Sequence, residues 1–249
     1  MRESVHDEYR RGGEHWWIRA RRTIFATMLD EVLGVRAGAG ARILDIGPGS
    51  GVNMPVLAPR GAVTVLDSDA SSLAACREVG ARAVVRADAL HPPLADATFD
   101  LVCALDVLEH LEDDAGALAA WRRLLSPGGH LLLSVPAFAF LWGRQDVLSH
   151  HKRRYRRPDL VAKVSAAGFA VRRASYFNTL LFPPIAGARL LMRPFLRRLV
   201  ARGTSDLAAP TPFGLDTALY RLFAAEAGWL SRRNLPVGVS ILLVASAPR

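Results

Sequence analysis

Cysteine is scarce in this sequence, and so are long apolar segments near its start. The only cysteines, Cys76 and Cys103, match neither a C-x-x-C pair nor a zinc spacing. This excludes a disulfide framework and a thiolate metal site, so we expect both to be small core residues. The opening stretch MRESVHDEYRRGGEHWW is charged from its second residue and lacks the apolar core of a secretory signal. We therefore expect a cytoplasmic location.

Lysine is nearly absent: Lys152 and Lys163 are the only two among 32 basic residues. A GC-rich genome explains arginine in place of lysine, but it does not explain a net charge of +9. The surplus is concentrated late in the chain, in residues 151–157 and at Arg189, Arg193, Arg197, Arg198 and Arg202. A basic surplus can bind RNA. The arginines are interleaved with few aromatic residues and no RNA module is recognisable, so nucleic acid is not the expected partner.

Short apolar runs alternate with helical segments from Ala41 onward, which predicts an α/β fold with a doubly wound, mostly parallel sheet of seven strands. With 249 residues, 51% of them hydrophobic, the chain is long enough for one core with an appendage. Helices are expected at 71–80, at 113–126, stopped by Pro127 and two glycines, and at 157–169. Strands are expected at 41–47, 62–67, 81–88, 99–106, 129–136, 169–175 and 238–247.

The gap between the sixth and seventh strands is far longer than a usual connection, so it indicates an insertion. We divide the chain into an N-terminal helical lid or cap (1–40), a Rossmann-like core (41–176 and 237–249) and a helical insertion (177–236).

A glycine turn, ILDIGPGSG, directly follows the first strand. Such a turn brings backbone amides and a helix N-terminus close to a ligand. The dinucleotide fingerprint requires G-x-G-x-x-G, but Val52 occupies its last position, and a Walker lysine is absent. These departures argue against NAD and against nucleoside triphosphates.

The turn resembles the first motif of the class I S-adenosylmethionine-dependent methyltransferases, hydrophobic-hydrophobic-D-x-G-x-G-x-G. The resemblance is strong over residues 41–136. HWWIRARR, LDVLEHL and HHKRRY add a finer resemblance to the broad type-11 group. It implies S-adenosyl-L-methionine as cofactor, with S-adenosyl-L-homocysteine as product.

The resemblance assigns cofactor roles to residues at four strand ends. Asp45 and the turn would bind the methionyl end, Asp67 the ribose hydroxyls and Asp88 the adenine amino group. The full expected set is Asp45, Gly47, Pro48, Gly49, Gly51, Asp67, Ser68, Asp88, Ala89 and Leu105.

Methyl transfer from a sulfonium requires positioning of the acceptor and, for a hydroxyl, removal of its proton. Candidate bases are His110 and either His150 or His151, and Asp106 could hold the cofactor or the acceptor. His110 and Glu109 could instead merely cap a helix. The paired histidines raise the question of a metal ion. No carboxylates at catechol-methyltransferase spacing are evident, so no metal ion is expected.

The substrate side is read from two further segments. Arg153, Arg154 and Tyr155 are expected to clamp an anionic group of the acceptor, the alternative being a solvated turn. Trp17, beside Trp16, is expected on a lid over the cofactor, the alternative being ordinary helix packing.

The insertion suggests a large apolar acceptor. Its apolar run is too short and interrupted to cross a membrane, but residues 177–202 could lie on a membrane surface, with arginines facing lipid phosphates. A roof over the acceptor pocket or a dimer contact are the alternatives.

These features favour a methyltransferase that acts on a hydrophobic small molecule, possibly anionic or lipid-linked, at or near the inner face of the membrane. The alternatives are an RNA methyltransferase and a catalytically silent cofactor-binding or membrane-associated partner protein. The oligomeric state is left open.

Overall fold

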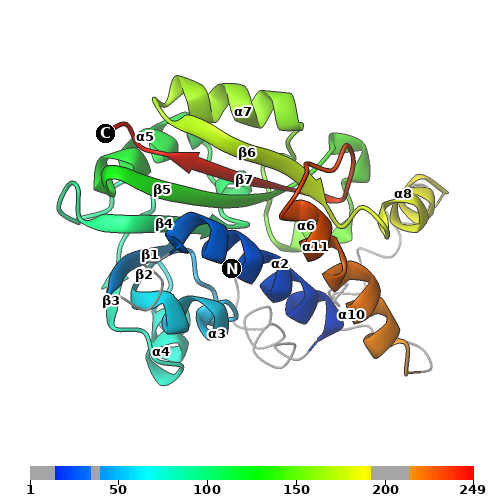
Figure 1. The fold of residues 1–249 in the computed structure, drawn as a ribbon, viewed down its shortest axis with the longest axis horizontal. Coiled ribbons are helices and arrows are strands. Elements are labelled where there is room, and N and C mark those ends of the chain that lie inside the picture. Colours follow the sequence, from blue (N-terminus) through cyan, green and yellow to red (C-terminus); the bar gives the residue numbers. More distant parts are fainter. Residues whose placement is uncertain (1–14, 35–39, 192–213) are drawn as a thin grey trace.

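The computed structural model describes residues 15–34, 40–191 and 214–249. Within these ranges one seven-stranded sheet has the order β3-β2-β1-β4-β5-β7-β6 (Figure 1). β5, β7 and β6 form antiparallel pairs and the other pairs are parallel, which confirms the expected α/β class. The strands are β1 (Ala41–Ile46), β2 (Gly61–Asp67), β3 (Ala83–Arg86), β4 (Phe99–Leu105), β5 (Leu125–Pro136), β6 (Ala170–Phe177) and β7 (Ser240–Ser246).

Helices cover both faces of this sheet. One face packs against α2 (Trp16–Leu33), α3 (Met54–Leu57), α4 (Ala70–Glu78), α10 (Asp216–Ala224) and α11 (Glu226–Leu230). The other face packs against α5 (Asp114–Leu124) and α7 (Arg157–Ala166). The two short helices α6 (Arg144–Leu148) and α8 (Phe182–Leu191) lie beyond the strand ends (Figure 1). Burial on both faces explains why the central strands are apolar almost throughout.

Local signals set two of the helix starts. The side chains of Asp69 and Asp113 accept hydrogen bonds from the first-turn amides of α4 and α5. The C-terminal prediction for α5 was wrong, because the helix ends at Leu124, before Pro127. Leu125 is already buried and extended, and it pairs with Phe99 as the first residue of β5. The third strand is also shorter than expected, and Asp88 follows it in a turn.

The insertion begins after Phe177, the last residue of β6, and its described helices join the main core. Phe223 of α10 is fully buried and stacks on Phe177, with ring centroids 6.2 Å apart. Glu226 of α11 is also buried, and its Oε1 accepts hydrogen bonds from the amides of Thr179 (2.7 Å) and Leu180 (2.9 Å). These contacts hold the described part of the insertion at the end of β6, and Tyr220 of α10 also contacts Thr23 and Arg19 of α2. Arg193, Arg197, Arg198 and Arg202 lie outside the described residues.

Candidate active site

The glycine turn after β1 forms one wall of a cavity. Gly47, Gly49 and Gly51 all have positive φ angles, of 64°, 56° and 76°. A side-chain Cβ at Gly47 would lie 2.6 Å from Cγ2 of Val107, so only glycine fits between β1 and the segment after β4. Gly47 to Ser50 line the cavity, whereas Gly51 lies behind it against Cys76 and Val79.

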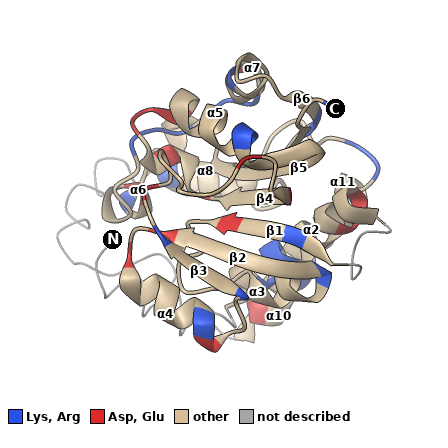
Figure 2. Ribbon diagram, turned by 90° about the vertical axis from the view of Figure 1, so that its left-hand side faces the viewer, with Lys and Arg blue, Asp and Glu red and all other residues tan. Residues whose placement is uncertain are grey.

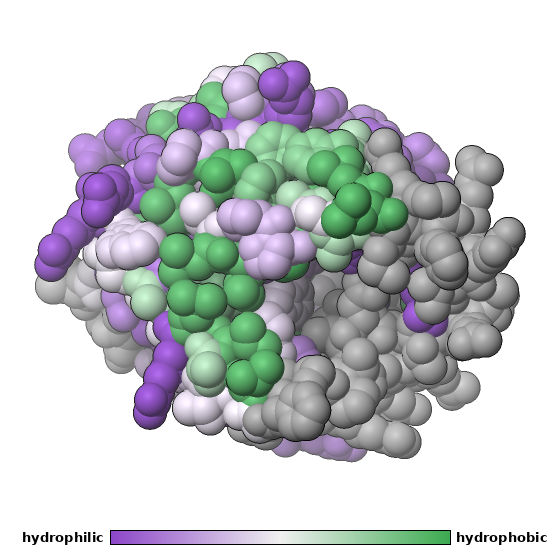
Figure 3. Space-filling model, turned by 90° about the vertical axis from the view of Figure 1, so that its right-hand side faces the viewer, coloured by the Kyte–Doolittle hydropathy of each residue, from purple (hydrophilic) through white to green (hydrophobic). Residues whose placement is uncertain are grey.

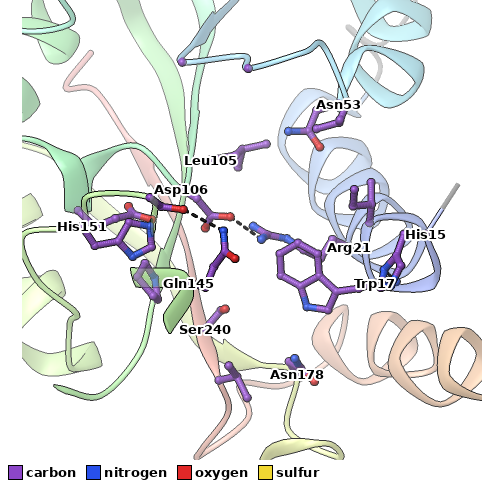
Figure 4. A pocket seen from close by; sticks show the side chains of 18 of the residues that line it. His15, Trp17, Arg21, Asn53, Leu105, Asp106, Gln145, His151, Asn178 and Ser240 are labelled. Atoms are coloured by element: carbon purple, nitrogen blue, oxygen red, sulfur yellow. Dashed lines mark hydrogen bonds and ion pairs between the residues drawn. The ribbon is translucent and has the colours of Figure 1, made fainter. Parts of the chain in front are cut away.

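The cavity has a volume of about 610 Å³ and lies at the carboxyl ends of the central strands (Figure 4). This is where open α/β sheets bind ligands. Its apolar wall includes Trp16, Trp17, Phe25, Leu105 and Ile185. The charged groups on its wall are Arg21, Asp106, Glu109, Arg144, Arg154 and Arg189, together with the imidazoles of His15, His110 and His151.

Asp45 lies near the end of β1 and is almost completely buried, at 1% exposure. Burial, and next to it the charge of Asp67, raises the pKa of this carboxyl to about 7. Its Oδ2 atom has no hydrogen-bond partner. A carboxylate oxygen with no partner has the chemistry to accept hydrogen bonds from the ammonium group of a methionyl ligand (Figure 2 shows the acidic residues on the strands). This role, which the resemblance implies, stays a prediction.

The other expected cofactor acids lie at the expected strand ends and, like Asp45, are not among the residues that line the cavity. Asp67 is the last residue of β2, and its Oδ1 accepts a hydrogen bond from the amide of Asp69 (2.9 Å). Asp88 has a side chain that is 60% exposed. Ser68 adjoins Asp67, and Ala89 accepts a hydrogen bond from the indole of Trp121 (2.9 Å). Their ribose and adenine roles stay predictions.

Asp106 follows β4 in the left-handed region, with φ at 61°, and faces the cavity (Figure 4). It forms an ion pair with Arg21 of α2, and its Oδ1 accepts a hydrogen bond from Ser134 (2.9 Å). The Arg21 guanidinium lies 4.4 Å from the Trp17 ring centroid. Trp17 is thus at the cavity wall as expected, although closure of a lid stays a prediction.

The sequence analysis did not identify Arg21, because nothing distinguishes it from the other charged residues of an amphipathic helix. Its side chain is only 7% exposed, so the residue belongs to the site and not to the solvated face of α2. The neighbouring pair Arg144 and Arg189 was missed as cavity residues too, since they come from α6 and α8, two elements that no motif marks.

The candidate bases His110 and His151 lie together at the cavity wall. Their rings meet edge to face with centroids 4.7 Å apart. Burial and the proximity of His151 lower the pKa of His110 to about 4, so its imidazole is neutral at pH 7. The Nδ1 atom of His151 lies 2.9 Å from Oδ1 of Asp146. His150, the other candidate, is not among the lining residues.

The expected clamp is not formed by residues 153–155. Arg153 binds the carboxylate of Asp114 (3.1 Å), and the buried Tyr155 hydroxyl donates to the same carboxylate (3.0 Å). Both residues lie outside the cavity wall. Arg154 does line the cavity, but its Nε and Nη2 donate to Asp146 at 2.7 and 2.9 Å. The prediction was wrong for Arg153 and Tyr155 because folding places buried acids against them.

Described helices near the cavity also carry exposed apolar side chains. Leu190 and Leu191 at the end of α8 are 49% and 82% exposed, and Leu222 and Trp229 of α10 and α11 are about two-fifths exposed. Figure 3 shows the apolar surface on the side of the molecule that carries α8 and α10. No helix within the described ranges is both long and apolar enough to cross a membrane.

The strand order, the final antiparallel strand and the glycine turn define the fold of this protein. Together they form the Rossmann-like fold seen in class I methyltransferases, with the glycine turn at the carboxyl end of β1. Residues 44–133 match the family described as "Methyltransferase domain".

Similar proteins agree with this assignment. The "Ubiquinone biosynthesis O-methyltransferase" of Alkalilimnicola ehrlichii is 34% identical over 155 residues, which cover 53% of this chain and 61% of that protein. The protein of the same name in Pseudomonas aeruginosa is 38% identical over 107 residues, covering 40% of this chain and 46% of that one. The chain thus spans less than two-thirds of the length of these curated relatives.

Solved structures share the fold. An S-adenosylmethionine-dependent methyltransferase from Mesorhizobium loti aligns with a TM-score of 0.55 at 21% identity, covering 88% of this chain and 95% of that one. Phosphoethanolamine N-methyltransferase 2 of Haemonchus contortus, in complex with S-adenosyl-L-methionine, aligns with a TM-score of 0.53 at 18% identity, covering 91% and 57%. Residues 44–133 therefore match a methyltransferase domain, and the described fold is the one found in these methyltransferase structures.

Proposed function

We propose that the protein transfers the methyl group of S-adenosylmethionine to an oxygen atom of an apolar, lipid-like small molecule. The cavity carries this proposal: the glycine turn lies at one side and Trp16, Trp17 and Ile185 at another, so cofactor and apolar acceptor would share one space. The relatives named as ubiquinone biosynthesis O-methyltransferases support an oxygen acceptor on such a molecule.

The chain's own residues suit this chemistry. The cofactor supplies a methyl group on a sulfonium, which needs no covalent help from the protein. Asp45 and the glycine turn would hold the methionyl end, and Asp106, fixed by Arg21 and Ser134, would orient the acceptor or cofactor. His110 is neutral at pH 7 and could accept the hydroxyl proton.

An anionic group on the acceptor is supported by the charges of the cavity wall. Four guanidinium groups line it, at Arg21, Arg144, Arg154 and Arg189. Of these, Arg21 is paired with Asp106 and Arg154 with Asp146, just behind the wall. Burial, and next the charge of Asp106, raises the pKa of Glu109 well above its usual range, so this carboxyl contributes less negative charge than its formula suggests. The anion-binding role therefore moves from Arg153 to the cavity arginines of α6 and α8.

Binding of the cofactor is the first step to test. Calorimetric titration of the purified chain with S-adenosylmethionine should show one site, and Asp67→Ala should weaken it at least tenfold while the exposed Asp159→Ala does not. A labelled methyl donor with phenols that do or do not carry an isoprenoid tail then tests transfer. No cofactor binding by the folded chain would refute the proposal. Binding with no transfer to any phenol would favour the silent partner protein.

We also propose that the chain works at a membrane surface through α8. This helix lines the cavity with Ile185 and Ala188 and exposes Leu190 and Leu191 at its end, so an apolar acceptor could pass from a bilayer to the cavity beside it. Flotation with anionic and with uncharged vesicles should show binding to the anionic ones, reduced in Leu190→Gln/Leu191→Gln. Val79→Gln is the control, because Val79 is as exposed as Leu190 but lies beside α4. Equal flotation of all three proteins would exclude this role for α8.

A further inference from the structure

Three metal-binding side chains meet at the cavity wall. Glu109, His110 and His151 each offer one ligand atom, and these atoms all lie within 4.8 Å of one another. His151 comes from the segment after α6, and the fold brings it to the Glu109-His110 pair, which follows β4. Glu109 Oε1 and His151 Nε2 are 3.9 Å apart.

The Glu109 carboxyl is the least satisfied polar group in this cluster. It is completely buried, yet neither Oε1 nor Oε2 has a hydrogen-bond partner. A buried carboxyl with both oxygens unpartnered is costly and needs an explanation, such as an ion that is bound when the protein works. A metal ion is a fitting explanation here, because Glu109 lies on the cavity wall beside two imidazoles.

The His151 imidazole is oriented by a carboxylate behind it. The Nδ1 atom of His151 is paired with Asp146, so the Nε2 atom of His151 points toward Glu109. Asp146 is itself buried and fixed by Arg154 and by the amide of Gly143 (2.7 Å). Metal-bound histidines nearly always have such a carboxylate or carbonyl partner on the second ring nitrogen, which fixes the tautomer.

We infer that Glu109, His110 and His151 hold a divalent transition-metal ion of the zinc type, with its open coordination side toward the cavity (Figure 4 shows His151 facing it). Two imidazoles and one carboxylate are a ligand set that zinc uses when it keeps a position open. Metal–nitrogen bonds of about 2.0–2.1 Å require ligand atoms about 3.3 Å apart, so the side chains would close by about 1.5 Å or less.

This inference replaces the expectation of no metal, which rested on the absence of closely spaced carboxylates. If the proposed function holds, the open position would bind the acceptor oxygen and make its proton easier to remove. In that case His110 would hold the ion and would not act as the base, and the proton would pass to solvent water. The site itself is independent of that role, because metal binding can be measured without cofactor or acceptor.

The test uses the full chain, stripped with a chelator and titrated with ZnCl₂, then with CoCl₂ followed by visible absorption. Wild type should bind one ion, and the cobalt form should show bands of a site with nitrogen ligands. His151→Ala and His110→Ala should each weaken zinc binding at least a hundredfold. His91→Ala, which removes an exposed histidine in the segment after β3, should leave the zinc affinity unchanged.

The two histidine variants are independent, so one that fails to fold leaves the other to decide. Circular dichroism establishes which variants fold. A folded wild-type protein that binds no zinc would overturn the inference, and so would equal affinities in wild type and a folded His110 or His151 variant. Cofactor titration of the stripped protein is a separate measurement: if it succeeds while zinc fails to bind, the metal site alone is rejected.

Discussion

The buried Asp45 should make the cofactor-free protein less stable as the pH rises. Its pKa in the folded protein is about 7, against an ordinary value of 3.8. Between these values the native state binds more protons than the unfolded chain, so the free energy of unfolding falls as the pH increases. From pH 5 to pH 8 the expected loss from this one group is about 2.5 kcal/mol, at 1.36 kcal/mol per pKa unit.

The perturbation is Asp45→Asn, which keeps the shape and removes the charge. Urea unfolding of wild type and variant without cofactor, at pH 5 and pH 8, gives the two differences to compare. The variant should lose about 2.5 kcal/mol less than wild type between these pH values, and it should bind S-adenosylmethionine more weakly. The control is Glu78→Gln, an exposed acid at the end of α4, which should follow wild type. Identical pH dependences for wild type and Asp45→Asn would refute the argument from burial.

Three further predictions concern the same region. Gly47→Ala forces a positive φ and a contact with Val107, at a cost of about 1–3 kcal/mol, so titration should show at least tenfold weaker cofactor binding; unchanged affinity would contradict the role of the turn. Arg154→Met leaves Asp146 buried without its cation and should cost about 3–5 kcal/mol in urea unfolding, whereas the double variant with Asp146→Asn should recover part of that loss; full additivity would contradict the pairing. Glu226→Ala removes the hydrogen-bond acceptor of the Thr179 and Leu180 amides, so their hydrogen exchange should speed up about tenfold or more, while the amide of Leu132 in β5 stays protected. Exchange rates at Thr179 and Leu180 that match those of wild type would argue against the anchor.

The order and type of most elements could be predicted from the sequence, because local signals determine them. Apolar runs specify the central strands, and Asp69 and Asp113 mark two helix starts. The glycine turn was predicted for the same reason, because it needs three left-handed residues in a fixed spacing. The cofactor role of Asp45 came from the resemblance and stays a prediction. The end of α5 was not predicted correctly. The pairing of Leu125 with Phe99 is a contact between distant segments, and it ends the helix before the proline signal.

The polar part of the site depends on contacts between distant segments, which a single sequence does not reveal. Arg21 meets Asp106 across 85 positions of the chain, and His151 meets Glu109 across 42. The block around Arg153 carried a strong charge signal, but Asp114 and Asp146 neutralise it on folding. Charge runs thus predicted where cations occur, and the fold decided which of them face the cavity.

The place where the insertion leaves and re-enters the sheet has a consequence for how this protein can diversify. β6 and β7 are neighbouring antiparallel strands, and the amide of Val239 returns to the carbonyl of Asn178 (3.4 Å). The insertion therefore starts and ends at nearly the same point, so its length can change at a loop-closure cost that grows only slowly with length. A longer or shorter segment could therefore stand here while the seven-stranded sheet and its glycine turn stay unchanged.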